Sequence, residues 1–256
     1  MSEYILEAHR GVAYECPDNT IAAFRAAKEQ GYGMIELDTK FTKDNKCVIL
    51  HNRTINHTAR YSDGRELEKE TAIAEITLEE ARTFDYGFWK GEQFRGELIP
   101  TLEEAIAFSR ENSIPLKFDN VIQSHTEEQL NIFFDTFERE NAISHVGFTS
   151  NNVEFIKKIL ARFPNAQIHY DGTISEAAIR EVSSVVPRDQ LTVWLRFHND
   201  RTSWCNTPAA SAELCAMTKK YAKIGVWLLD KREELEIAVE WGADIIETDG
   251  KLKPIK

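Results

Sequence analysis

The sequence predicts a single (β/α)8 barrel, the TIM-barrel fold, with a small insertion after the second strand. Short apolar runs alternate with longer helix-period segments along nearly the whole chain, a pattern typical of parallel strands joined by crossover helices. There are eight such runs, the strand number of a closed barrel. The chain has 256 residues, and a barrel of this kind needs roughly 250, so one barrel would use nearly all of it.

The predicted strands and helices alternate in chain order. The strands are Tyr4–Ala8, Met34–Lys40, Leu116–Asp119, Val146–Thr149, Gln167–Tyr170, Leu191–Arg196, Ile224–Leu229 and Asp244–Glu247. The helices between them are Thr20–Gln30, Leu102–Asn112, Glu127–Glu140, Val153–Arg162, Ser175–Ser184, Ala212–Ala222 and Arg232–Trp241. An open doubly wound sheet is the alternative with the same alternation, but no Gly-rich phosphate loop follows the first strand.

Capping residues support the helix boundaries. Asn19 is expected to cap the first helix, and Gly31 to end it. Thr101 and Glu104 have the spacing of a capping box at the start of the next long helix. The last residues, Lys251–Lys256, are too few for a final outer helix, so we expect the helical layer to be incomplete there.

The segment between Phe41 and Pro100 departs from the simple repeat. Residues 42–46 read as a turn, and Cys47–Leu50 as a short returning run that delivers His51. Residues from about 52 to 98 are polar and include a short helix at Thr77–Phe84. Because the loops after barrel strands carry function, we expect this insertion to lie at the mouth of the site.

Composition narrows the function classes. The formal net charge is −11 and no long Lys/Arg block occurs, which argues against a nucleic-acid partner or an anionic membrane surface. No apolar run approaches membrane-spanning length, and no signal peptide is visible, so a cytoplasmic protein without stable membrane insertion is the expectation. The four cysteines are scattered, which predicts neither a zinc site nor a disulfide framework. The oligomeric state is left open.

His9-Arg10-Gly11 places two side chains suited to phosphoester chemistry at the end of the first predicted strand. Arg is the side chain best shaped to hold a phosphate through paired N–H donors. His is the side chain most easily tuned to move protons near neutral pH. A lone His-Arg pair is often surface decoration, so the rest of the chain must support the interpretation.

Acidic residues at strand ends are candidate metal ligands. In Glu36-Leu37-Asp38, strand alternation puts both carboxylates on one face. Two inward acids are costly unless something pairs with them, and a hard divalent cation such as Mg²⁺ or Ca²⁺ suits oxygen ligands. Asp119 ends a third strand and could complete the site. Exposed acids on an edge strand, and an Asp that merely starts a loop, are the alternatives.

Further candidates have weaker signals. His51 follows an apolar run and becomes interesting as a second imidazole beside His9. The loop after the sixth strand offers Arg196 and His198, together with Arg201 and Trp204, as a surface for a phosphate or a sugar-like face. Trp227, on the seventh strand, is either a substrate contact or a barrel-core aromatic.

Several motifs coincide in order along the chain. They are His9-Arg10-Gly11, Pro17-Asp18-Asn19-Thr20, Phe24, Gly31, Ile35-Glu36-Leu37-Asp38, Thr42-Lys43-Asp44, Val48 through His51, Ile99-Pro100-Thr101-Leu102-Glu103-Glu104, Gly242-Ala243-Asp244 and Thr248-Asp249. With these motifs the chain resembles the glycerophosphodiester phosphodiesterase family over nearly its whole length. The resemblance implies a TIM barrel that uses a divalent cation to hydrolyse phosphodiesters, such as glycerophosphocholine, to an alcohol and glycerol 3-phosphate.

The resemblance also implies roles for particular residues. His9 and His51 match the family's acid/base pair, and Arg10 matches a phosphate-contacting arginine. Glu36 and Asp38 match two metal ligands. Asp119 falls where the family usually has a glutamate as its third ligand.

Two positions depart from the family pattern. Val121 stands where the family commonly has a phosphate-contacting lysine. Lys117 could project to the same face by strand alternation, deeper in the barrel, and is therefore a candidate phosphate contact. The segment from Trp227 to Asp230 reads Trp-Leu-Leu-Asp, where the family often has Trp-Thr-Val-Asn.

Three outcomes are compatible with these residues. The first is hydrolysis of a small phosphodiester substrate, assisted by a cation and two histidines. The second is attack by an internal hydroxyl that releases a cyclic phosphate, as in the distantly similar sphingomyelinase D enzymes. The third is a barrel that binds phosphodiesters without turning them over.

Overall fold

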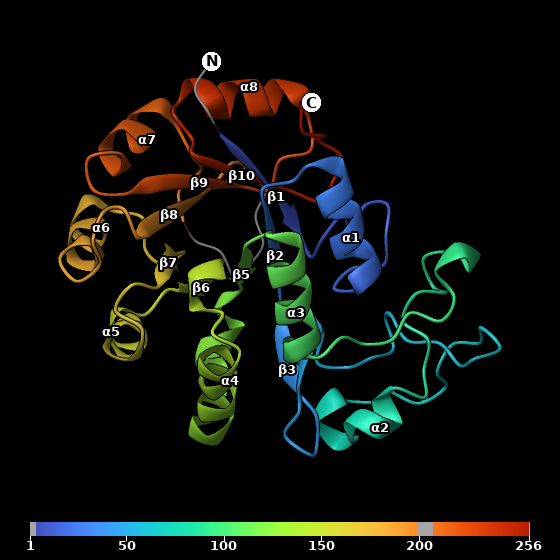
Figure 1. The fold of residues 1–256 in the computed structure, drawn as a ribbon. Coiled ribbons are helices and arrows are strands. Elements are labelled where there is room, and N and C mark those ends of the chain that lie inside the picture. The colour runs from blue at the N-terminus through green and yellow to red at the C-terminus, as the bar shows by residue number, and fades with distance from the viewer. Residues whose placement is uncertain (1–3, 199–206, 256) are drawn as a thin grey trace.

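Eight parallel strands form one closed ring in the computed structural model, which describes residues 4–198 and 207–255 (Figure 1). In chain order the strands are β1 (Ile5–His9), β2 (Met34–Leu37), β5 (Leu116–Phe118), β6 (Val146–Ser150), β7 (Gln167–Tyr170), β8 (Leu191–Arg196), β9 (Lys223–Trp227) and β10 (Ile245–Thr248). β1 closes the ring against β10, with Ile5 opposite Ile245 and Ala8 opposite Thr248. The predicted barrel is confirmed, and the open doubly wound sheet is excluded.

The helices lie outside the ring of strands (Figure 1). They are α1 (Ile21–Gln30), α3 (Leu102–Asn112), α4 (Glu127–Arg139), α5 (Val153–Arg162), α6 (Glu176–Ser183), α7 (Ala212–Thr218) and α8 (Arg232–Glu240). The structure confirms each predicted helix to within a few residues, α7 being four residues shorter at its end. In the described part of the chain, no helix follows β10, as predicted. None of the described helices is both long enough and apolar enough to cross a bilayer.

A cluster of phenylalanines fixes one side of the barrel. Phe118 on β5 meets Phe133 and Phe137 of α4 edge to face, with ring centroids 5.3 Å apart in both pairs. Phe148 on β6 joins the cluster, and all four rings are fully buried. Burial of each such ring stabilises the fold by roughly 1.5–3 kcal/mol. Because Phe118 points outward into this cluster, its neighbours Lys117 and Asp119 are turned toward the barrel interior and mouth.

The first helix begins one residue later than predicted. Thr20, not Asn19, is the N-cap, and its hydroxyl accepts a hydrogen bond from the Ala23 N–H. Asn19 instead has a left-handed backbone (φ 57°), a conformation that asparagine tolerates, and its Nδ2 donates to Asp38 Oδ2 at 3.0 Å. The Asn19 amide is therefore used to orient a strand-end carboxylate. The Thr101–Glu104 capping box is confirmed.

A hairpin and an insertion follow β2. β3 (Thr39–Phe41) and β4 (Cys47–Ile49) pair in antiparallel fashion around the predicted turn, and the chain then reaches His51. The insertion contains η1 (Ile73–Glu75), α2 (Leu78–Ala81) and η2 (Glu92–Phe94), so the helix predicted at Thr77–Phe84 is a single turn. It has an apolar cluster of its own, made of Val48, Leu50, Ile55, Ala59, Ile73, Ala81, Tyr86 and Ile99.

His125 is a partly buried imidazole with a lowered pKa. It follows η3 (Asn120–Ser124), its Nε2 lies 3.0 Å from Thr39 Oγ1, and its ring packs edge-on against Phe41. Burial, and after it the Lys40 charge, lowers the pKa of His125 to about 4. The unfolded chain therefore takes up this proton at a higher pH than the folded protein does. The stability that His125 contributes is present above the unfolded pKa and is lost as pH falls toward 4.

We expect His125→Gln to flatten the acid side of the stability profile. Between about pH 7.5 and about pH 5 the wild type should lose more free energy of unfolding than the variant, because only the wild type has this imidazole with a lowered pKa. Urea unfolding at both pH values, with EDTA present, measures the two losses. Equal losses would contradict the assignment.

Candidate active site

The carboxyl ends of the barrel strands surround a cavity of about 430 Å³, called the barrel cavity below. It brings together eight of the ten predicted site residues. These are His9, Arg10, Glu36, Asp38, His51, Lys117, Asp119 and Trp227. The residues that complete its lining are Asn120, Thr149, Asp171, Trp194, Leu228 and Glu247. The location matches the catalytic face of barrel enzymes.

Two predicted substrate contacts lie elsewhere in the described structure. Arg196, at the end of β8, is buried, and its guanidinium donates to the Thr207 carbonyl at 2.5 Å. His198 Nε2 lies 3.5 Å from Glu234 Oε2 of α8. Neither residue lines the barrel cavity, so their role in binding substrate stays a prediction. Arg201 and Trp204, from the same loop, lie outside the described residues.

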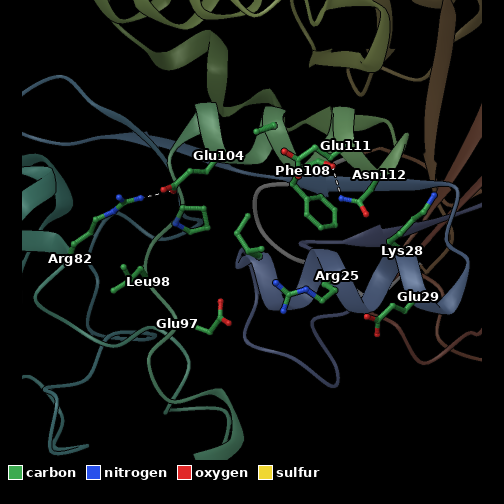
Figure 2. A pocket seen from close by; sticks show the side chains of 13 residues that line it. Arg25, Lys28, Glu29, Arg82, Glu97, Leu98, Glu104, Phe108, Glu111 and Asn112 are labelled. Atoms are coloured by element: carbon green, nitrogen blue, oxygen red, sulfur yellow. Dashed lines mark hydrogen bonds and ion pairs between the residues drawn. The ribbon is translucent and has the colours of Figure 1, made fainter.

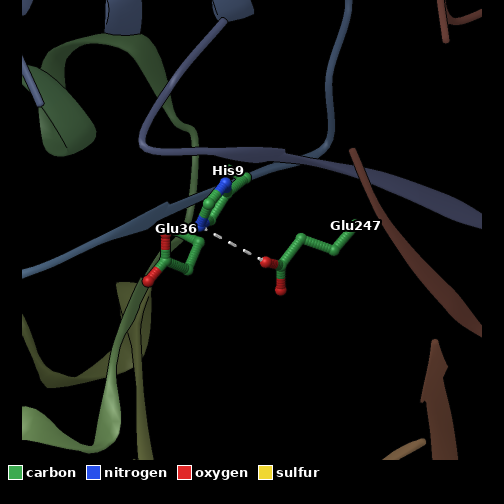
Figure 3. Close-up of side chains that lie close together, drawn as sticks. All are labelled: His9, Glu36 and Glu247. Carbon is green, nitrogen blue, oxygen red and sulfur yellow. Dashed lines mark ion pairs between the residues drawn. The ribbon is translucent and has the colours of Figure 1, made fainter. Parts of the chain in front are cut away.

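His9 is oriented by an acid from the other end of the chain. Its Nδ1 lies 2.6 Å from Asp249 Oδ1, which follows β10. This contact favours the tautomer with the proton on Nδ1 and turns Nε2 toward the cavity. Nε2 is 3.9 Å from both Glu36 Oε2 and Glu247 Oε1 (Figure 3). Burial lowers the pKa of His9, but the Asp249 hydrogen bond and the Glu247 charge raise it by more, so the net shift is upward.

Arg10 is held at the cavity mouth by two acids. Its Nε lies 3.3 Å from Asp38 Oδ2, and its Nη1 lies 3.6 Å from Asp18 Oδ2. The backbone at Arg10 is left-handed (φ 55°), and Gly11 follows with φ 80°. A Cβ at Gly11 would lie 2.8 Å from the backbone carbon of Ala23, so only glycine lets this turn pass α1.

The three predicted metal ligands are each oriented through one oxygen. Glu36 Oε2 accepts a hydrogen bond from the Arg10 N–H at 3.1 Å, and Asp119 Oδ2 accepts one from the Val121 N–H at 3.1 Å. Asp38 is held by the Asn19 amide described above. Burial, followed by the nearby Asp38 carboxylate, raises the pKa of Glu36 well above its usual value and also raises that of Asp119. Burial is the larger cause of both shifts, and the neighbouring negative charge adds to it.

The donor set fits a hard divalent cation. Among the described residues, His9, Glu36 and Glu247 bring one ligand atom each within 4.8 Å of one another (Figure 3). Asp38 and Asp119 line the same cavity but lie outside this close group. Carboxylate oxygens predominate, as Mg²⁺ and Ca²⁺ prefer. A cation here would offset the charge that raises the carboxyl pKa values.

Glu247 lines the barrel cavity and Asp249 contacts His9, but neither is among the site residues predicted from the sequence. Glu247-Thr248-Asp249 repeats the acid-x-acid pattern of Glu36-Leu37-Asp38 at the end of another strand. This repeated pattern is the sequence feature that could have indicated Glu247 and Asp249. The two acids at the end of β2 and the two at the end of β10 flank β1, which places His9 between them.

Lys117 lies at the floor of the barrel cavity with its charge compensated. Its Nζ is 2.5 Å from Glu7 Oε1, 2.6 Å from Glu247 Oε2 and 3.6 Å from the centre of the Trp194 ring. Burial lowers the pKa of Lys117, but Glu247 and then Glu7 raise it by more. Burial opposes the ionisation of Glu247, yet the Lys117 charge takes its pKa down to about 2. Burial raises the pKa of Glu7 to about 8.

The wall opposite His9 is also polar. Asn120 donates a hydrogen bond to Asp171 at the end of β7, and Thr149 of β6 lies nearby in the cavity lining. Burial raises the pKa of Asp171 to about 6. Trp227 and Leu228 supply an apolar edge. Trp227 therefore lines the cavity and is not confined to the barrel core.

Comparison with known proteins identifies the family. Residues 9–251 match the model of the glycerophosphoryl diester phosphodiesterase family. The chain belongs to this family. It is a phosphodiesterase, an enzyme that cleaves phosphoric diesters.

Relatives of this phosphodiesterase cover nearly its whole length. The glycerophosphodiester phosphodiesterase of Caldanaerobacter subterraneus subsp. tengcongensis is 29% identical over 246 residues, which span 94% of this chain and 92% of the relative. A solved Oleispira antarctica phosphodiesterase, in complex with the product sn-glycerol-3-phosphate, has a TM-score of 0.75 at 20% identity and covers 96% of this chain and 93% of that one. A Parabacteroides distasonis glycerophosphoryl diester phosphodiesterase has a TM-score of 0.73 at 18% identity, covering 97% and 84%.

A wider groove of about 660 Å³ lies outside the barrel of the phosphodiesterase, between α1, α3 and the insertion (Figure 2). Its charges are mixed: Arg82 pairs with Glu104 at 2.5 Å, and Arg25 faces the half-buried Glu97. None of the predicted site residues line this groove. The groove is larger than the barrel cavity, but the predicted site residues gather in the barrel cavity.

We expect Lys117→Met to destabilise the phosphodiesterase strongly. Removing the ammonium leaves a buried, uncompensated Glu247 carboxylate, which typically costs about 3–5 kcal/mol. Chemical denaturation measures the change. The matched control is Lys157→Met, which removes an exposed pair with Glu154 and should cost at most about 0.5 kcal/mol.

The double variant Lys117→Met/Glu247→Gln separates the charge effect from lost packing. It should recover part of the loss, because one of the two acids that contact Lys117 is then uncharged. A Lys117→Met loss below about 1 kcal/mol would contradict the compensated-charge assignment.

Proposed function

We propose that the protein hydrolyses glycerophosphodiesters with a divalent cation, Mg²⁺ or Ca²⁺, and that His9 and His51 form its acid/base pair. The observation that carries the proposal is the meeting of both imidazoles, the Arg10 guanidinium and three strand-end carboxylates in one cavity. A relative named as a glycerophosphodiester phosphodiesterase and a structural neighbour solved with sn-glycerol-3-phosphate support this substrate class.

Arg10 would bind the phosphate. Asp38 and Asp18 hold its guanidinium in place before substrate arrives, so little side-chain freedom remains to be lost on binding. The side chain is 23% exposed, which leaves part of the guanidinium open to a ligand. A fixed positive charge beside the phosphorus centre stabilises the charge that develops in the transition state.

Glu36, Asp38 and Asp119 would hold the cation, with Glu247 facing Glu36 from β10. A bound cation supplies Lewis-acid stabilisation of the phosphate oxygens. The carboxyl groups are oriented by Arg10, Asn19 and Val121, the kind of outer contact that fixes ligand geometry. Their presence in one cavity and the raised pKa values of Glu36 and Asp119 support a cation as their partner.

Two imidazoles can divide the proton transfers. Asp249 holds Nδ1 of His9 and so leaves Nε2 as the atom that gives or takes a proton. His51 Nδ1 lies 2.7 Å from Asn52 Oδ1, which orients the second ring in the same way. One imidazole would deprotonate the attacking group, and the other would protonate the leaving alkoxide.

Phosphorus NMR of the products tests the proposed reaction. With a glycerophosphodiester and added Mg²⁺, Ca²⁺ or Mn²⁺, we expect glycerol 3-phosphate and the free alcohol. A cyclic phosphate that persists would show that an internal hydroxyl of the substrate attacks the phosphorus, in place of water. Binding of the diester without any product would instead identify a non-catalytic barrel.

Removal of either imidazole should slow turnover. We expect His9→Ala and His51→Ala each to lower kcat by at least about 10²–10⁴-fold, the typical contribution of general acid–base catalysis. His145→Ala is the matched control, because His145 lies in η4 (Ile143–His145) at the start of β6, the opposite end of the barrel. Near-normal turnover in either site variant would rule out the acid/base role of that histidine.

Cation binding can be measured apart from activity. In titration calorimetry of metal-free protein with Mg²⁺, Ca²⁺ or Mn²⁺, Glu36→Gln and Asp119→Asn should each weaken binding by at least about 10–100-fold, the cost of losing even an outer-shell contact. Glu79→Gln, on the exposed face of α2, should bind as the wild type does. Full activity after exhaustive EDTA treatment, with no metal left by elemental analysis, would refute the requirement for a cation.

A further inference from the structure

A second cavity, of about 310 Å³, shares His9 and Arg10 with the barrel cavity. We call it the insertion cavity, because His57, Trp89 and Lys90 of the insertion line it. Tyr14 from the loop after β1 and Lys251 after β10 also line it. His9 and Arg10 therefore stand between two cavities, one in the barrel and one bounded by the insertion.

This arrangement suits the shape of a phosphodiester. A tetrahedral phosphorus carries two ester substituents, here called arms, that point in different directions. If the phosphate is bound at His9 and Arg10, as the proposed function requires, one arm enters the barrel cavity and the other enters the insertion cavity. The insertion cavity then contacts a part of the substrate that the barrel strands do not reach.

Lys90 gives the insertion cavity a positive charge that no described carboxylate neutralises. Its Nζ donates to the Ala13 carbonyl at 2.6 Å and lies 5.4 Å from the Trp89 ring centre. The other charges are paired: Asp18 faces Arg10, Asp249 faces His9, and Lys251 contacts Asp230 at 2.7 Å. A carbonyl positions the Lys90 ammonium without cancelling its charge, so the group can still accept an anionic ligand.

The aromatic rings of the cavity are poorly suited to a quaternary ammonium. Trp89 has the Lys90 ammonium 5.4 Å away and the His57 ring 5.3 Å away. Tyr14 has the Lys251 ammonium 5.3 Å from its ring centre. An aromatic face attracts a cationic headgroup, but a cation already close to the ring repels a second one. Here a ligand cation would meet two lysines.

We propose that the insertion cavity binds the second ester arm of the substrate and that Lys90 selects alcohol moieties bearing an additional anionic group. A carboxylate or a phosphate on the alcohol would reach the Lys90 ammonium while the diester phosphate stays at His9 and Arg10. Alcohols that carry only an amine lack this contact and place their positive charge beside Lys90 and Lys251.

Glycerophosphoserine and glycerophosphoethanolamine test the proposal, because the two diesters differ by one carboxylate. We expect the wild type to have the higher kcat/KM for glycerophosphoserine. Lys90→Met should lower the ratio of the two kcat/KM values by about tenfold or more, the worth of a charge-assisted hydrogen bond. Lys90→Arg keeps the charge and should retain most of the ratio. Lys158→Met, on the exposed face of α5, is the matched control.

Other outcomes would overturn the proposal. If the wild type has a kcat/KM for glycerophosphoserine no higher than that for glycerophosphoethanolamine, Lys90 does not select anionic alcohols. If Lys90→Met lowers kcat/KM equally for both diesters, Lys90 acts on the fold or on the shared phosphate. If neither diester is hydrolysed, the proposed function fails, and titration calorimetry of the two unreacted diesters still tests Lys90. Equal affinities there would overturn the selection independently.

Discussion

Negative charge concentrated at the mouth of the barrel is the constraint on which the rest of the site depends. Glu36, Asp38, Asp119 and Glu247 all line one cavity, in a chain whose net charge is already −11. Such a cluster repels itself and repels a phosphate diester unless cations are placed among the acids. The fold places two permanent ones there: Arg10 against Asp38, and Lys117 between Glu7 and Glu247. A divalent cation on the remaining carboxylates would complete the balance.

Lys117 and Arg10 occupy different depths of the barrel cavity and therefore have different roles. Lys117 is buried beneath the cavity, between two carboxylates and against the Trp194 ring, so its charge supports the barrel interior and Glu247. Arg10 lies at the rim, where a ligand can reach it. His9 stands next to Arg10 on the same strand end, held by Asp249. The proposed proton transfer and phosphate binding would thus take place at the boundary between the barrel and insertion cavities.

Local patterns predicted most of this structure. The alternation of apolar runs and helix-period segments gave every barrel strand, because each strand must bury its own side chains whatever its neighbours are. Strand alternation also placed Glu36 and Asp38 on one face correctly. What local patterns could not predict are partners distant in sequence. Asn19 matches a helix cap locally, but Asp38 uses its amide. The acids that contact Lys117, Glu7 and Glu247, meet it only when the ring closes β1 between β2 and β10.

The proposed mechanism requires a cation on Glu36 beside a phosphate bound at His9 and Arg10. Anomalous diffraction from crystals grown with Mn²⁺ and glycerol 3-phosphate tests it most directly. The account predicts one strong peak in contact with a Glu36 oxygen, with Asp38 and Asp119 as further ligands and a phosphate oxygen on the side of Arg10. A phosphate bound at Arg10 with no metal peak near Glu36, or a peak confined to another part of the molecule, would contradict it.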